Sequence, residues 1–353
     1  MPNVGIIGLS RSGKSTVFSA LTNIPYSFSS DTNKVGIVKV SDERLEYLRD
    51  LYKPLKYTPA TFEFVDIKGS NSTVKGSLNS SLSSVREVDC LAIVIRGFVL
   101  DGLDTNYVDD LDNLLLELIL SDYSQLERRL ERLEKKLKAK ENGAFEEKLL
   151  IEKLLLRYAE GLIYRVEELD SKEQEIICNF NLLSLKKMIC ILNISEQEIS
   201  SIETSSKYLE LKDKCEKLGF PLLYIAANIE LEINSLEKEE EKAYFMESYN
   251  LVSLASSKVI KEAFKCLGLK TYFTAGTPEV RAWIFKEGYK APDCAGIIHS
   301  DFKNGFIRAE TLSFKDLLTY KTPQLARSNG KYRLEGKEYL VEDGDIMLFR
   351  FNV

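Results

Sequence analysis

A glycine-bracketed loop near the N-terminus limits the possible folds of this chain more than any other feature; it reads Gly8-Leu9-Ser10-Arg11-Ser12-Gly13-Lys14-Ser15. A short apolar run (residues 4–9) leads into it, and residues 16–21 continue as a helix. A strand, such a loop and a helix in this order predict a phosphate-binding P-loop. Its N–H groups and the helix N-terminus face phosphate oxygens. We expect Lys14 to contact the β- and γ-phosphates and Ser15 to bind Mg²⁺.

A second motif, which contains an aspartate, narrows the class of P-loop protein. Residues 61–66 alternate between polar and apolar side chains, as a strand does, and end in Asp66-Ile67-Lys68-Gly69. At the tip of a strand beside the P-loop strand, Asp66 can hold Mg²⁺ through water. Gly69 can offer its N–H to the γ-phosphate and is, with Lys14, a candidate catalytic residue. The motif favours a GTPase-like fold over a kinase.

Two further apolar runs end where such a fold places its base-reading loops, at the carboxyl ends of parallel strands. Residues 188–192 lead into Asn193-Ile194-Ser195-Glu196, and residues 222–225 lead into Ala226-Ala227-Asn228. A GTPase normally carries Asn-Lys-x-Asp at the first of these loops. Here the lysine is missing and glutamate replaces aspartate, which weakens the case for guanine selectivity. The alternative for Asn193 and Glu196 is an ordinary strand-end turn and helix cap.

Length, composition and charge limit the number of domains and the kinds of partner that the chain can bind. With 353 residues, the chain is expected to form two or three domains. Its net charge of −6 argues against a nucleic-acid coat over the whole surface. The N-terminus lacks signal-peptide features, and no apolar run reaches the roughly 20 residues of a membrane helix. We therefore expect a cytoplasmic protein without membrane or sequence-specific DNA contacts. The six scattered cysteines predict reduced thiols, and His299, the only histidine, predicts a structural role.

A helical hairpin is expected in the middle of the chain. Leucines at 126, 130, 133 and 137 follow a 4-3-4 spacing, and Leu155, Ala159, Leu162, Val166 and Leu169 predict a second helix. Asn142-Gly143 lies between them as a turn. Basic residues stand at 128, 129, 132, 135, 136, 138 and 140, against Glu131 and Glu134. They form either a solvated coiled-coil face or an arm that contacts RNA phosphates.

Together these motifs resemble the YchF family of Obg-like ATPases, within the translation-factor class of P-loop GTPases. The resemblance covers nearly the whole chain, and its most specific part is C-terminal. That part includes Thr271-Tyr272-Phe273-Thr274-Ala275-Gly276, Glu279-Val280-Arg281-Ala282-Trp283, Ala291-Pro292, Ile298-His299-Ser300-Asp301-Phe302, Gly305-Phe306-Ile307-Arg308-Ala309-Glu310 and residues 341–353.

The resemblance implies an α/β fold of three domains, one of which is split into two, so that the chain divides into four segments. These are a GTPase-like domain (residues 1–110 and 185–268), a helical coiled-coil insertion (111–184) and a C-terminal TGS domain of β-grasp shape (269–353). It implies Mg²⁺-dependent hydrolysis of ATP, with GTP accepted less well or equally, and association with the ribosome or ribosomal RNA. The residues implied to bind the nucleotide are Arg11, Ser12, Gly13, Lys14, Ser15, Thr16, Asn193, Ile194, Glu196, Ala226 and Ala227. Ser30 aligns with the family's Mg²⁺-binding threonine.

The chain departs from the family at several places, which include a shortened switch at residues 71–81. Arg11 replaces an asparagine that helps related enzymes hold a potassium ion; it either faces solvent or places its charge near the phosphates, as an arginine finger does. Ser70 replaces a hydrophobic residue after Gly69. No histidine occurs in residues 96–102, where the family carries one implicated in hydrolysis. Two hypotheses follow: an active ATPase, or a nucleotide sensor that hydrolyses very slowly or not at all.

Overall fold

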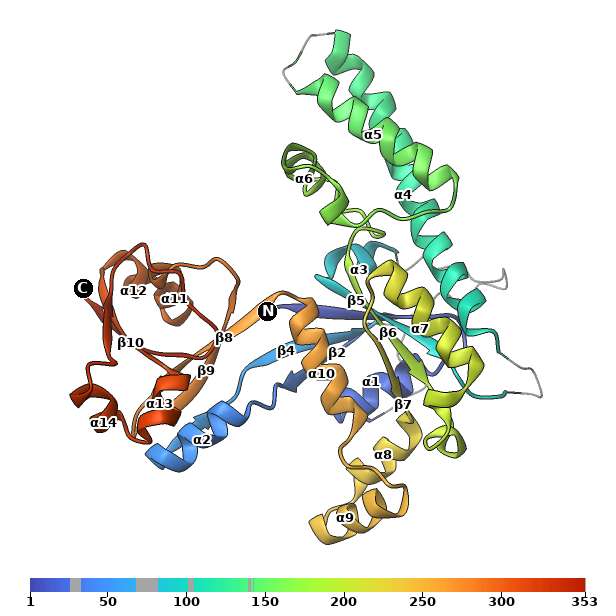
Figure 1. The fold of residues 1–353 in the computed structure, drawn as a ribbon. Coiled ribbons are helices and arrows are strands. Elements are labelled where there is room, and N and C mark those ends of the chain that lie inside the picture. Colours follow the sequence, from blue (N-terminus) through green and yellow to red (C-terminus); the bar gives the residue numbers. More distant parts are fainter. Residues whose placement is uncertain (26–32, 68–81, 101–104, 139–140, 142, 353) are drawn as a thin grey trace. The chain divides into compact units, whose positions relative to one another are not determined.

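The computed structural model describes residues 1–25, 33–67, 82–100, 105–138, 141 and 143–352. The chain forms two compact units (Figure 1). The first comprises Met1–Gly36 and Glu63–Val259, and the second comprises Ile37–Phe62 and Ile260–Val353. Within the described ranges, none of the helices combines the length and the apolar character that crossing a bilayer requires.

A largely parallel sheet with buried strands forms the centre of the first unit. Its order is β2 (Lys34–Lys39), β4 (Thr61–Asp66), β1 (Asn3–Ile7), β5 (Cys90–Arg96), β6 (Lys187–Asn193) and β7 (Leu222–Ile225). β1 pairs in parallel with β4 and β5, and parallel pairing continues through β6 to β7. The strands expected at residues 4–9, 61–66, 188–192 and 222–225 are confirmed. Their carboxyl ends share one edge, so the loops that follow them meet there.

Helices cover this sheet, and local sequence explains several of their ends. α1 (Lys14–Thr22) confirms the helix expected after the P-loop. α6 (Ser171–Ile177) starts after Asp170, whose carboxylate accepts the N–H groups of Lys172 and Glu173. The first unit also contains α3 (Leu82–Glu87), α7 (Ser206–Leu218), α8 (Ala227–Ser235), α9 (Glu239–Ser248) and the start of α10 (Ala255–Cys266).

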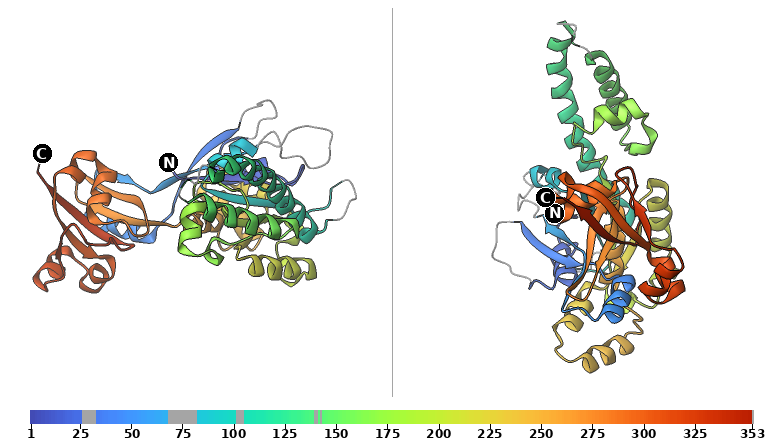
Figure 2. Two further views of the ribbon diagram at one scale, coloured as in Figure 1. Left: turned by 90° about the horizontal axis from the view of Figure 1, so that it is seen from above. Right: turned by 90° about the vertical axis from the view of Figure 1, so that its left-hand side faces the viewer.

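The expected hairpin consists of α4 (Tyr107–Lys138) and α5 (Ala144–Ala159), which lie side by side in Figures 1 and 2. Leu126 and Leu133 are buried, and Leu130 and Leu137 pack against the same core. Gly143, in the predicted turn, precedes the first residue of α5 with φ 80°. The 4-3-4 leucine spacing therefore identifies the packed face of α4 correctly.

The predicted course of the second helix is wrong beyond Ala159. α5 ends there, and Gly161 has a φ of 73°, which is incompatible with a continuing helix. Leu162 is 52% exposed, and Val166 starts a separate 3₁₀ turn (Val166–Glu168). The buried residues of α5 are instead Ala144, Leu150, Ile151, Leu154 and Tyr158. A leucine spacing that continues by chance past Gly161 misled the prediction.

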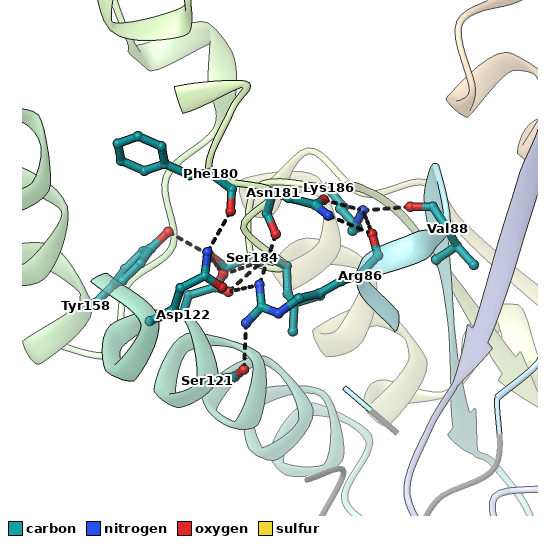
Figure 3. A network of polar contacts seen from close by, with 11 residues as sticks. Arg86, Val88, Ser121, Asp122, Tyr158, Phe180, Asn181, Ser184 and Lys186 are labelled. Atoms are coloured by element: carbon teal, nitrogen blue, oxygen red, sulfur yellow. Dashed lines mark hydrogen bonds and ion pairs between the residues drawn. The ribbon is translucent and has the colours of Figure 1, made fainter. Parts of the chain in front are cut away.

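A buried carboxylate fastens the base of the hairpin to the sheet (Figure 3). Asp122 of α4 is 0% exposed and accepts the N–H groups of Leu183 and Ser184 at 3.0 and 2.7 Å. Arg86 of α3 donates to Asp122 at 3.2 Å, and Tyr158 of α5 is bonded to Ser184 at 2.6 Å. Burial raises the pKa of Asp122, while its hydrogen-bond donors and Arg86 oppose that rise. Helices α3 and α4 and the segment before β6 thus meet at Asp122, and α5 joins them through Ser184.

The second unit contains its own six-stranded sheet around an aromatic core. The order is β11 (Arg333–Glu335), β10 (Phe306–Ser313), β12 (Asp345–Phe351), β8 (Leu269–Ala275), β9 (Glu279–Lys286) and β3 (Lys56–Thr58). Its helices are α2 (Glu43–Tyr52), α11 (Ala291–Ile298), α12 (Ser300–Asn304), α13 (Phe314–Tyr320) and α14 (Pro323–Ser328). Tyr272, Phe285 and Phe349 pack together, and the Tyr272 hydroxyl donates to the carbonyl of Cys294. β12 confirms the terminal strand expected at residues 346–351.

Residues 37–62, which run from within β2 to within β4, belong to this second unit although β2 and β4 pair in the sheet of the first. β3 pairs in parallel with β9, and Arg44 of α2 forms an ion pair with Asp343 at 2.7 Å. Asp343 also accepts the N–H of Thr271 at 2.8 Å. The family resemblance implied that this segment belongs to the GTPase-like domain (residues 1–110); the four-segment division stays a prediction.

Candidate nucleotide-binding site

The loop between β1 and α1 curls around the ammonium group of Lys14. Lys14 Nζ donates to the carbonyls of Gly8 and Leu9 at 2.7 and 2.9 Å. The N–H of Ser12 closes a turn onto the carbonyl of Leu9 at 3.3 Å. Arg11 and Gly13 have φ values of 62° and 84°, in the left-handed region. These backbone angles form the curl that a P-loop needs in order to surround phosphate oxygens.

Two buried polar atoms at this site lack a hydrogen-bond partner among the described residues: Ser12 Oγ and Asp66 Oδ1. Asp66, at the end of β4, is 2% exposed. Burial lowers the pKa of Lys14, and the negative charge of Asp66 opposes that effect. Because an unpaired buried carboxylate oxygen is costly, this atom suits a hydrated cation.

The protein groups fit Mg²⁺ held partly by phosphate and water. In the described part of the chain, no group of three or more His, Cys, Asp or Glu side chains could hold a metal ion by itself. Ser15 is the second residue of α1, and Asp66 supplies a carboxylate oxygen without a partner at the same edge of the sheet. Mg²⁺ commonly keeps several waters and takes one or two protein oxygens plus substrate phosphates.

Asn193, at the end of β6, connects three loops of this edge. Its Nδ2 donates to the carbonyl of Ser12 at 3.2 Å, and its Oδ1 accepts the N–H of Ala227 at 3.3 Å. Its backbone carbonyl accepts the N–H of Gly97, after β5, at 2.7 Å. Asn193 is 4% exposed, so its amide is engaged in holding the P-loop and the β7–α8 loop together.

The other residues expected near the base lie on either side of Asn193. Ile194 is buried and donates its N–H to Ile225 at 2.9 Å. Ala226 and Ala227 are buried at the start of α8. Glu196 is exposed in a short 3₁₀ turn (Glu196–Glu198), and the acid that caps this turn through Ser195 is Glu198, not Glu196. The Glu196 carboxylate is therefore not used as a cap.

Three of the predicted residues lie outside the described part of the chain, and one residue close to the P-loop, Phe98, was not predicted. Ser30, Gly69 and Ser70 belong to the ranges that the structure does not describe, so their roles stay predictions. Phe98 follows β5, and a Cβ placed on Gly13 would lie 3.7 Å from its ring. The only sequence signal for the closeness of Phe98 to Gly13 is that Phe98 follows a strand at the carboxyl edge of the sheet.

The tight fit at Gly13 leads to a testable expectation. A Cβ at this position would lie 2.2 Å from Asn193 Nδ2, on a backbone with φ 84°. Gly143 has a similar φ of 80°, but a Cβ there would meet nothing within 4 Å. We expect Gly13→Ala to lose nucleotide binding and about 2–4 kcal/mol of stability, and Gly143→Ala to lose only the roughly 1–2 kcal/mol of left-handed strain. Urea unfolding and ATP titration of both variants measure this; equal stability losses would contradict it.

The fold and these loops define a P-loop NTPase of the GTPase class. Residues 3–141 match the family described as 50S ribosome-binding GTPase. Residues 269–352 match the YchF-GTPase_C family, described as a protein of unknown function.

Similarity to known proteins extends over the full length. The ribosome-binding ATPase YchF of Bacillus subtilis (strain 168) is 40% identical over 362 residues, covering 99% of each chain. The protein of the same name from Escherichia coli O157:H7 is 37% identical over 364 residues, with the same coverage. The structure of the Schizosaccharomyces pombe YchF GTPase superposes with a TM-score of 0.85 and 32% identity, covering 99% of this chain and 97% of that one. The chain belongs to the YchF family, and the expected α/β fold class is confirmed.

Proposed function

We propose that this chain is a Mg²⁺-dependent ATPase that associates with the ribosome in the cytoplasm. Its relatives from Bacillus subtilis and Escherichia coli are named ribosome-binding ATPases and match it from end to end. The observation that carries the proposal is the pairing of Lys14, whose ammonium lies over the P-loop carbonyls, with Asp66, whose Oδ1 is buried without a partner. A cation and a free carboxylate at one loop suit a magnesium–phosphate ligand.

Each residue has a distinct role in this proposal. Lys14 neutralises the β- and γ-phosphates, and Ser15, Ser30 and Asp66 hold Mg²⁺ directly or through water. Bound Mg²⁺ supplies further charge neutralisation on the phosphate oxygens. Gly69 donates its N–H to the γ-phosphate. Ser12, Gly13 and Thr16 complete the phosphate cradle at the N-terminus of α1.

Base preference rests on the loops after β6 and β7. In the proposal, Ile194, Ala226 and Ala227 contact the base through apolar surface, which accepts adenine. Asn193 positions these loops through Ser12 and Ala227. The exposed Glu196 stands where a GTPase has the aspartate that bonds guanine. We expect ATP to bind at least as tightly as GTP.

Calorimetric titration of the full chain with ATP and GTP, in Mg²⁺ and in EDTA, tests this assignment. The expected result is comparable or tighter binding of ATP and weaker binding of both nucleotides in EDTA. GTP binding more than about tenfold tighter than ATP would overturn the base assignment. Co-sedimentation with 70S ribosomes, with and without ATP, tests the partner.

Arg11 offers a separate test of the catalytic hypothesis. Its φ of 62° disfavours a side chain, so Arg11→Gly should stabilise the protein by about 1 kcal/mol through the relief of left-handed strain. If Arg11 acts as an arginine finger, the same variant should lose on the order of 10³-fold in phosphate release while keeping its ATP affinity. Thermal unfolding and single-turnover hydrolysis separate the two effects. Unchanged hydrolysis would identify Arg11 as a solvent-facing residue.

A further inference from the structure

A shallow groove with an apolar lining and an acidic rim lies where α8 leads into α9. Its volume is about 270 Å³, and it is lined by Leu236, Glu240, Glu241, Tyr244 and Phe245. We call it the α9 groove. Tyr244 is 70% exposed although most of its side chain is apolar. An exposed tyrosine that lines a groove, instead of standing alone on a convex surface, marks a place where a partner can bury apolar area.

The floor of the α9 groove is fixed by packing beneath the helix. Phe245 is half-buried and, together with Met246 and Tyr249, packs against the core of the first unit. Leu236, which follows the last residue of α8, is half-buried as well. α9 lies beyond α8 at the margin of the first unit (Figure 1), and Tyr244 stays exposed there. The groove therefore has a preformed apolar floor and a side that is open to solvent.

The rim of the α9 groove carries net negative charge. Residues 232–247 contain six glutamates and two lysines, a formal charge of −4, against −6 for the whole chain. Glu241 pairs with Lys238 at 3.0 Å through exposed side chains, and Glu240 has no ion-pair partner among the described residues. Exposed pairs of this kind are weak, so a cation that enters the groove can compete for Glu241.

We propose that the α9 groove binds a basic segment of a protein partner, with one lysine or arginine side chain inserted beside Tyr244. The negative charge of Glu240 and Glu241 attracts a cationic group. The face of an exposed aromatic ring attracts the same cation, and the apolar floor accepts the methylene groups of its stem. The rim repels nucleic-acid phosphates and anionic lipid headgroups, so a protein segment is the partner that fits.

Binding of a basic peptide to the full-length protein tests the groove. The probe is a fluorescein-labelled peptide of about 12 residues that repeats arginine, leucine and lysine, long enough to cover the groove, and fluorescence anisotropy follows its binding. Glu240→Gln/Glu241→Gln should weaken binding about tenfold, since two exposed charge pairs with the peptide are lost. Tyr244→Ala should weaken it about three- to fivefold, and Tyr244→Phe should bind as the wild type does, because a phenyl ring also attracts a cation.

A matched control removes the same amount of charge from other helices of the first unit. Glu175 of α6 and Glu216 of α7 are exposed, and neither has an ion-pair partner among the described side chains. Glu175→Gln/Glu216→Gln should change the affinity for the peptide less than about twofold, since salt screens distant charges. Equal affinities for the wild type and Glu240→Gln/Glu241→Gln would overturn the proposal, as would an equal loss in the control.

Two further outcomes distinguish a groove from diffuse attraction between charges. If Tyr244→Ala binds the peptide as tightly as the wild type does, charge alone holds the peptide and the proposal is overturned. Displacement of the peptide by an equal concentration of spermidine would also overturn it, because the surface would then bind any small polycation. ATP titration of the groove variants should give the wild-type affinity, which shows that they are folded, since the substituted residues lie on α9 and not in the P-loop.

Discussion

Replacing Lys14 with alanine is expected to weaken ATP binding on the order of 100-fold or more. A charge-assisted hydrogen bond contributes about 1.5–3 kcal/mol, and Lys14 is expected to contact two phosphates. Its ammonium already lies at the loop, bonded to the carbonyls of Gly8 and Leu9. No other lysine or arginine side chain is expected to replace it, apart from the tip of Arg11. Titration with ATP in the presence of Mg²⁺ gives the affinity directly.

Thermal unfolding provides an independent readout of the same variant. A ligand that binds only the folded state raises its stability by about 2.7 kcal/mol at a concentration 100 times its Kd. ATP should therefore raise the melting temperature of the wild type and of a Lys212→Ala control, which removes an exposed lysine of α7. Lys14→Ala should show no such rise. If ATP raised the melting temperature of Lys14→Ala as much as that of the wild type, the nucleotide would bind at another site.

Replacing Asp122 with alanine is expected to destabilise the first unit by about 3–5 kcal/mol, the usual effect of breaking a buried ion pair. The change leaves the N–H groups of Leu183 and Ser184 buried without an acceptor and Arg86 without its partner. Because these groups belong to different elements, the loss should loosen the base of the hairpin. Urea unfolding monitored by circular dichroism measures the change in free energy.

An exposed acid on the same helix supplies the control for Asp122. Asp112 of α4 pairs with Lys214 at 2.8 Å, and both side chains are partly exposed. Surface pairs of this kind contribute at most about 1 kcal/mol, so Asp112→Ala should have a small effect. Asp122→Asn should be intermediate, since its amide oxygen still accepts one of the two N–H groups. Similar losses in the free energy of unfolding for Asp112→Ala and Asp122→Ala would contradict the stabilising role of Asp122 in the network of Figure 3.

Features set by local sequence could be predicted. The strands that end before Gly8, at Asp66 and at Asn193 are apolar or alternating runs, and the P-loop signature places a helix directly after Gly13. Parallel strands bring their carboxyl ends to one edge, which made the gathering of Lys14, Asp66 and Asn193 predictable in outline. The leucine spacing of α4 likewise identified its buried face.

Features that depend on distant contacts could not be predicted. β3 joins the sheet of the second unit through β9, which lies more than 200 residues away in the chain, and no local pattern announces that pairing. Asn193 holds Ser12 and Ala227 together because the loops that carry them meet at its side-chain amide. The early end of α5 depends on the single backbone angle of Gly161. Sequence spacing identifies candidates for each role but not which partners they meet.

The most direct test of the central claim is steady-state phosphate release from ATP in Mg²⁺ by the wild type and by Lys14→Ala. We predict release by the wild type that the variant abolishes, since Lys14 and the Mg²⁺ residues Ser15 and Asp66 would act together at one site. No release by the wild type, with ATP binding still measurable, would contradict the account and leave a nucleotide sensor. Equal release by both proteins would also contradict it, because the activity would then belong to another site or another protein.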